Sequence, residues 1–140
     1  MLVMAPAPTL LYQNNAGQVL ADPAGFLRSH WSPAPRTLAD TQALLNSLSA
    51  GLRQYGWSRA LINQVAMPPF SEAEQQWVVQ QWLPQAVHEA GYRLGAIVVA
   101  SNIYSRLAMA YVTTSVQGLP MRYRSFDDEA EARAWLLKQR

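Results

Sequence analysis

The chain has 140 residues, of which half are hydrophobic and 14% are charged, and its formal net charge at pH 7 is +2. This length fits one domain with a sizeable core, and the basic residues are scattered rather than gathered in a run, which argues against nucleic-acid binding. The absence of cysteine excludes disulfides, thiolate nucleophiles and cysteine-based metal sites.

The first eight residues, Met1–Pro8, are predicted to form a loose leader before a single domain that spans residues 9–140. The leader has no basic segment and is interrupted by Pro6 and Pro8, so it does not resemble a signal peptide. No stretch approaches the ~18 consecutive apolar residues that a membrane span needs. We therefore expect a cytoplasmic protein without a membrane span.

Three strands are predicted in the first part of the chain. Leu10–Gln13 and Gln18–Ala21 flank Asn14–Gly17, whose Asn and Gly residues favour the tight turn of a β-hairpin. Gly25–Trp31 is predicted as a third strand. The two prolines of Ser32–Pro35 then favour a rigid loop, because each fixes its own φ and disfavours helix in the residue before it.

A helix is predicted over Leu38–Tyr55, where leucines recur at helical spacing and define one buried face. Thr37 and Asp40 have the spacing of an N-cap residue and its N3 partner, and Gly56 suits the position after the helix. Ala60–Val65 is predicted as the next strand.

The start of the second helix carries the clearest local pattern in the chain. Ser71 and Glu74 fit the S-x-x-E capping box, in which each side chain accepts a hydrogen bond from a free backbone N–H group. The bulky residues of Trp77–Trp82 predict an apolar inner face. Pro84 is expected to kink or break this helix, which then resumes and ends at Gly91.

The remaining elements alternate strand and helix. Arg93–Ala100 contains the apolar run AIVVA, which predicts a central parallel strand covered on both faces. A helix over Ile103–Val116 and a strand over Pro120–Phe126 follow. A last helix begins at a second predicted capping box, formed by Asp128 and Glu131.

This order of elements predicts a single-domain α/β fold. We expect a mixed sheet of about five or six strands with about four packed helices. The N-terminal hairpin is antiparallel and the later strands are parallel.

Residues for metal, cofactor or catalytic chemistry are sparse. His30 and His88 are the only histidines and lie far apart, which makes a metal site improbable. The acidic residues of Asp127–Glu131 fit the first turn of a helix better than a catalytic cluster, because they complement its dipole. No phosphate-binding glycine loop or nucleophile elbow occurs. The sequence therefore predicts no enzyme, no cofactor and no metal.

A ligand site is conceivable at the end of the central strand. Ser101 and Asn102 follow that strand and open a helix, where ligands of open α/β sheets collect, although helix capping alone also explains both residues. An apolar pocket is predicted beside them. Its residues are Trp31, Met67, Phe70 and Tyr104.

The element order, the capping box at Ser71 and the phrase RSFDDEAEARAWL at Arg124–Leu136 together resemble the SpoIIAA-like domains of the STAS (sulfate transporter and anti-sigma-factor antagonist) class. The resemblance extends over about Leu10–Lys138. It implies a mixed sheet with packed helices that is used mainly for protein–protein regulation. Some members of the class bind nucleotides or lipids, and most are not enzymes.

The chain departs from that class at its regulatory motif. Where anti-sigma antagonists carry Asp-x-Ser with a phosphorylatable serine, the matching residues here are Asn63–Val65, so neither the aspartate nor the serine is present. Ser71 is the substitute candidate, because a phosphate at a helix N-terminus is electrostatically favoured. Its hydroxyl is already accounted for as a helix cap.

The sequence thus predicts a non-enzymatic cytoplasmic regulatory or protein-interaction domain. The low charge density leaves room for a subunit interface, so we expect a homodimer or another protein partner. The alternative is a small-molecule or lipid-binding domain that uses the apolar pocket beside Ser101 and Asn102.

Overall fold

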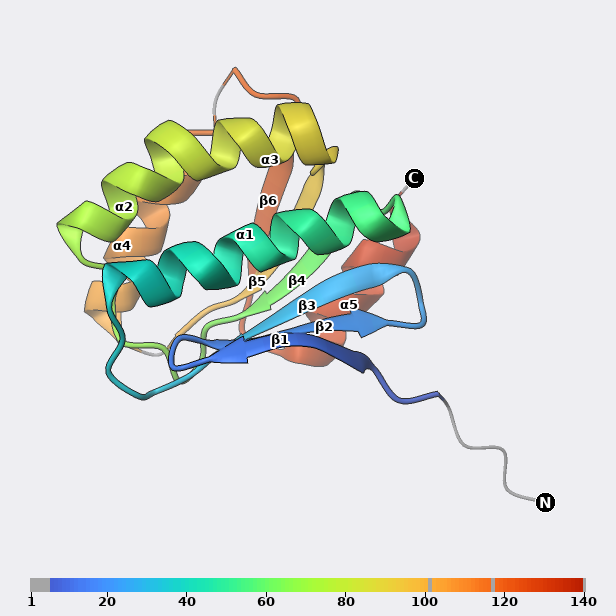
Figure 1. Cartoon of the computed structure of the whole chain (residues 1–140), viewed down its shortest axis with the longest axis horizontal. Helices are drawn as coiled ribbons and strands as arrows, with labels where there is room; N and C mark the ends of the chain where they lie inside the picture. Colours follow the sequence, from blue (N-terminus) through green and yellow to red (C-terminus); the bar gives the residue numbers. More distant parts are fainter. Residues whose placement is uncertain (1–5, 101, 117, 140) are drawn as a thin grey trace.

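The computed structural model of the protein describes residues 6–100, 102–116 and 118–139. It has the predicted α/β architecture, with six strands that form one mixed sheet in the order β1-β2-β3-β4-β5-β6 (Figure 1). Each strand therefore pairs with its neighbours in sequence. Of the predicted leader, residues 1–5 lie outside the described residues, and residues 6–8 precede the first strand.

The N-terminal half of the sheet is an antiparallel meander. It comprises β1 (Thr9–Asn14), β2 (Gly17–Asp22) and β3 (Phe26–Trp31). The predicted hairpin is confirmed, and its turn pairs Asn14 with Gly17. The side chain of Asn14 also accepts a hydrogen bond from the backbone N–H of Ala16 at 2.8 Å, which is the local bonding that makes Asn favourable in turns.

The C-terminal half of the sheet is parallel. β4 (Arg59–Asn63) pairs with β3, β5 (Leu94–Val98) with β4, and β6 (Arg122–Phe126) with β5. Every residue of β5 is buried, as its continuous apolar run predicts for a strand covered on both faces.

The helices cover the two faces of the sheet unequally (Figure 1). One face carries α1 (Leu38–Tyr55), the continuous helical segment described below, and α4 (Ile103–Thr114). The other face carries α5 (Glu129–Lys138), which packs on β4, β5 and β6. The larger core lies on the first face. The smaller core lies under α5 and includes Leu61, Val98 and Leu136.

The helical segment around Pro84 is continuous, so the prediction that Pro84 breaks the helix is wrong, and a π-helical turn precedes the proline instead. α2 (Glu72–Trp77) passes into a π-helical turn, η1 (Val78–Trp82), and then into α3 (Leu83–Ala90). In the wide turn the N–H of Leu83 donates to the carbonyl of Val78, five residues back. Pro84 thus lies in the first turn of α3, directly after the wide turn.

Of the three predicted capping boxes, two are confirmed in full. Both hydrogen bonds of a capping box are present at Thr37 and Asp40, and again at Ser71 and Glu74. At α5 the carboxylate of Asp128 accepts from the N–H groups of Ala130 and Glu131, but no return bond from the Glu131 side chain is found within the described residues. Asp128 therefore caps this helix alone, because one carboxylate oxygen satisfies two of its free N–H groups.

In the described part of the chain, no helix combines the length and the hydropathy that crossing a membrane requires.

Candidate functional site

The parallel strands end at one edge of the sheet, where α4 begins. β5 leads through α4 to β6, and the carboxyl ends of β5 and β6 lie beside α4. α4 packs against α2 on one side and places Ala108, Met109 and Val112 in the larger core. On its other side a crevice separates α4 from β6, at the position where open α/β sheets collect ligands.

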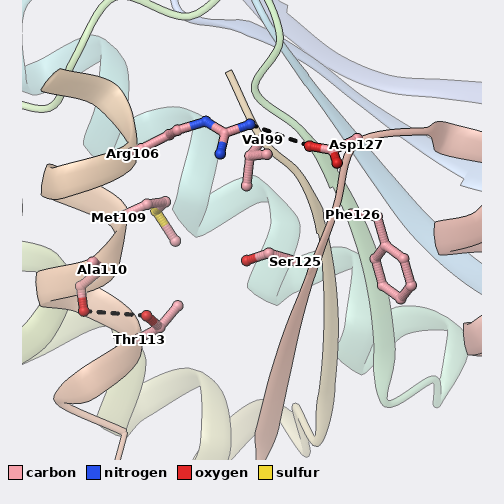
Figure 2. A pocket seen from close by; sticks show the side chains of 8 residues that line it. All are labelled: Val99, Arg106, Met109, Ala110, Thr113, Ser125, Phe126 and Asp127. Atoms are coloured by element: carbon pink, nitrogen blue, oxygen red, sulfur yellow. Dashed lines mark hydrogen bonds and ion pairs between the residues drawn. The ribbon is translucent and has the colours of Figure 1, made fainter. Parts of the chain in front are cut away.

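We call this space the α4–β6 crevice; its volume is about 280 Å³ (Figure 2). The lining residues are Val99, Arg106, Met109, Ala110, Thr113, Ser125, Phe126 and Asp127. Figure 2 shows that the Phe126 ring points away from the crevice. That ring packs against Trp135 of α5, with ring centroids 5.8 Å apart, so Phe126 contributes mainly its backbone to the wall.

A pair of opposite charges stands at one end of the crevice. Nη2 of Arg106 lies 3.1 Å from Oδ1 of Asp127, and Nε of Arg106 donates to the carbonyl of Ala100 at 2.8 Å. The Arg106 side chain is 50% exposed and that of Asp127 is 87% exposed. Solvent screens such an exposed ion pair and weakens it, so both charged groups are able to bind a ligand as well.

The other polar groups of the crevice are hydroxyls. Ser125 extends from β6 toward α4 (Figure 2). On the opposite wall the hydroxyl of Thr113 donates to the carbonyl of Ala110 at 3.1 Å, which leaves its oxygen able to accept. Val99 and Met109 supply apolar surface between the charged end and the hydroxyl end.

The outward side of α4 is also apolar. Four large side chains lie there with exposures of 65% for Ile103, 70% for Tyr104, 62% for Leu107 and 50% for Tyr111. We call these four residues the α4 face. Three of them are spaced four residues apart and therefore form one row along the helix. The sequence IYSRLAMAYV already shows apolar residues on both sides of this helix, a pattern that indicates an exposed apolar face.

The apolar residues predicted to form a pocket are dispersed. Phe70 and Trp31 pack edge to face with ring centroids 5.4 Å apart and line a small cavity of about 20 Å³. A cavity of that size holds about one water molecule. Met67 is buried in the larger core but does not line the cavity, and Tyr104 is exposed on α4.

The two predicted polar anchors of the pocket are Asn102 and Ser101. Asn102 is the N-cap of α4, and its side-chain oxygen accepts from the N–H groups of Tyr104 at 2.8 Å and Ser105 at 3.3 Å. Its side chain is thus used for capping, as the alternative explanation held. Ser101 lies outside the described residues. Neither Met67 nor Phe70 lines the α4–β6 crevice.

Ser71 starts a buried polar cluster that the sequence did not indicate. Its N–H donates to Glu74, whose carboxylate also accepts from Nε and Nη2 of Arg36 at 2.7 and 3.0 Å. The Thr41 hydroxyl donates to the same carboxylate. Burial alone raises the pKa of Glu74, but hydrogen bonds from Arg36, Thr41 and Ser71 outweigh it and lower the pKa below its usual value.

Two tyrosines pack beside the middle of β5, of which Tyr92 is fully buried and Tyr123 is half-buried. Burial raises the pKa of Tyr92 well above its usual value, and burial likewise raises that of Tyr123. Their rings occupy the space beside Gly95, where an added Cβ would lie 2.2 Å from Cε1 of Tyr123 and 2.5 Å from the Tyr92 hydroxyl. Gly95 is therefore needed for close packing, and both hydroxyls stay protonated near neutral pH.

Both histidines, Asp22 and Glu129 lie outside the α4–β6 crevice. Glu129 lies 2.5 Å from Nη1 of Arg28 and 3.6 Å from Nε2 of His30, while Nε of Arg28 contacts Asp22 at 2.8 Å. His88 is exposed in the last turn of α3. Across residues 6–100, 102–116 and 118–139, no three side chains of the metal-binding types are grouped as metal ligands.

Comparison of the chain with protein-family models, with curated proteins and with solved structures gives no match in any of the three.

Proposed function

We propose that this protein is a non-enzymatic interaction domain that docks through the α4 face. The observation that carries the proposal is the exposure of four large apolar side chains, half to two-thirds or more of each, on one side of one helix. Large contiguous apolar patches on soluble proteins mark interaction sites, because their exposure to water is unfavourable.

The opposite side of α4 supports this interpretation. Ala108, Met109 and Val112 cover the larger core, so the helix is apolar on its inner and its outer side. A helix that covers a core needs only one apolar side, and its outer side is normally polar. A second apolar side is explained when another protein covers it.

The partner that best fits the α4 face is a second copy of the chain. Arg106 is the only charged residue between Ile103 and Thr114, and it is already engaged by Asp127 of its own chain. Two such faces can therefore meet without contacts between like charges. In a two-fold arrangement the same patch serves both subunits. An axis near Leu107 would place Ile103 against Tyr111 of the second copy.

The resemblance to SpoIIAA-like domains supports a regulatory use of such an interface. The serine switch of that class is not part of the proposal, because Val65 stands at its position. Ser71 stays a candidate phosphorylation site. Its hydroxyl accepts from the N–H of Glu74 at 3.1 Å, so a phosphate there would replace a neutral cap by a charged one.

Sedimentation of wild-type protein and of Leu107→Lys tests the proposal. We expect a concentration-dependent dimer for the wild type and a monomer for the variant, because the lysine would place two like charges at the two-fold axis. Leu137→Lys is the matched control, since Leu137 is an exposed leucine of α5 on the other face of the sheet. A dimer that resists Leu107→Lys would contradict docking through the α4 face.

Cross-linking through one introduced cysteine per subunit locates the two-fold axis of the dimer. The introduced residue is the only thiol, because the chain contains no cysteine of its own. Under mild oxidation we expect Leu107→Cys to form a disulfide-linked dimer and Leu137→Cys to stay monomeric. The disulfide requires Cα atoms within about 7 Å of each other. Equal cross-linking of both variants would indicate random collision rather than an interface.

A further inference from the structure

We propose that the α4–β6 crevice binds a free α-amino acid. This inference does not depend on docking through the α4 face, because it concerns the other side of the helix. Its basis is the combination of an opposite-charge pair, an apolar wall and two hydroxyls in one small space (Figure 2).

The charge pair selects the ligand class. Nη1 of Arg106 points into the crevice and has no hydrogen-bond partner within the described part of the chain (Figure 2). A simple anion at this guanidinium would also meet the carboxylate of Asp127, and a simple amine at Asp127 would meet the guanidinium. A zwitterion satisfies both groups, because its carboxylate bonds to Arg106 and its ammonium to Asp127.

The rest of the crevice limits the ligand's side chain. Its volume of about 280 Å³ falls just below the ~300–1,000 Å³ typical of pockets for drug-sized ligands. Val99 and Met109 offer apolar contact next to the charged end. The hydroxyls of Ser125 and Thr113 lie further along and would accept or donate a hydrogen bond. These contacts fit a short aliphatic side chain or one with a single polar group.

The backbone holds the guanidinium in place before any ligand arrives. Nε of Arg106 donates to the carbonyl of Ala100, the second residue after β5, at 2.8 Å. Two of the three guanidinium nitrogens are thus engaged by the protein and the third faces the crevice. Such fixation reduces the entropy that binding would otherwise cost.

NMR titration of the ¹⁵N-labelled full chain tests the proposal, with L-leucine, L-methionine, L-threonine and L-glutamine as probes. We expect saturable shift changes at α4 and at the end of β6 for at least one of them. Two analogues of leucine separate its charges. 4-Methylpentanoate has the leucine skeleton without the ammonium, and 3-methylbutylamine has it without the carboxylate. Each should bind at least about tenfold more weakly, because one charge-assisted contact is lost.

Substitutions of single residues in the crevice identify which side chains contact the bound amino acid. Arg106→Gln and Asp127→Asn should each weaken binding at least about tenfold, whereas Arg122→Gln, an exposed arginine outside the crevice, should leave it unchanged. Ser125→Tyr should abolish binding by filling the crevice while both charges stay in place. The absence of saturable shifts with all four amino acids at millimolar concentration overturns the proposal. Binding that 4-methylpentanoate reproduces in full, or that Asp127→Asn does not affect, overturns it as well.

Discussion

At the scale of single residues, the buried carboxylate of Glu74 is held by four hydrogen bonds. It accepts from the guanidinium of Arg36, which also donates to the carbonyls of Pro68 and Pro69 at 3.2 Å. The Arg36 guanidinium stacks near the rings of Trp31 and Phe70. Arg36 therefore joins the loop before α1 to the loop before α2, and Glu74 supplies its counter-charge.

Glu74→Gln tests this pair. At neutral pH we expect a loss of about 3 kcal/mol in the free energy of unfolding, because the buried guanidinium of Arg36 loses its counter-ion. The pKa of Glu74 is lowered from 4.5 in the folded protein. Its contribution to stability is therefore present above about pH 4.5 and is lost as the pH falls below that value.

Urea unfolding at a series of pH values measures both effects. The wild type should lose more stability than Glu74→Gln as the pH is lowered from about 6 to about 3. Glu72→Gln is the matched control, since Glu72 is exposed in the same helical turn. Equal acid sensitivity of wild type and Glu74→Gln would show that the pair does not contribute as described.

At the scale of elements, helix starts depend on local side chains and helix interiors on the sheet beneath them. The hydroxyl of Ser71 caps α2, and Asn102 caps α4. The π turn before Pro84 is a different adjustment. It lets one helical segment continue past a proline, so that Val78, Trp82 and Leu83 all stay buried against the larger core.

Ser71→Ala should lower the free energy of unfolding by about 1 kcal/mol, because the N–H of Glu74 loses its acceptor. Ser71→Asp should retain most of the stability, since its carboxylate can accept the same bond. Chemical denaturation measures all variants. Ser47→Ala in the middle of α1 is the control and should not destabilise, because alanine is favoured in helix interiors. An equal loss in both alanine variants would refute the capping role.

At the scale of the whole molecule, the sheet separates two cores of unequal size. The smaller core under α5 depends on β5, whose Val98 is fully enclosed there. A charge at this position would face apolar side chains with no counter-ion. The cost of an unpaired buried charge exceeds the few kcal/mol by which a domain of this size is stable.

Val98→Asp should therefore prevent folding, which circular dichroism and the dispersion of NMR amide signals would report. Val65→Asp introduces the same charge at an exposed position two residues after the end of β4, and should fold normally. A folded Val98→Asp protein would mean that β5 is not enclosed on both faces.

The sequence alone determined the elements, their order and two complete capping boxes, because those depend on residues within about four positions of one another. It also determined that β5 is an interior parallel strand covered on both faces, since a continuous apolar run has no polar side to expose, although β5 lies next to the edge strand rather than at the centre of the sheet. Of its predicted pocket residues, Trp31 and Phe70 came together, whereas Met67 lies elsewhere in the core and Tyr104 is exposed. No local pattern distinguishes a core residue from one that lines a pocket.

Only the tertiary structure decided the rest. Arg36 and Glu74 meet although they are 38 residues apart, and Arg106 meets Asp127 from an adjacent element. Which apolar side of α4 covers the core depends on how the helix lies over the sheet. The need for glycine at position 95 depends on where Tyr92 and Tyr123 place their rings. Contacts between distant segments decide such features, because they depend on the packing of whole elements rather than on local spacing.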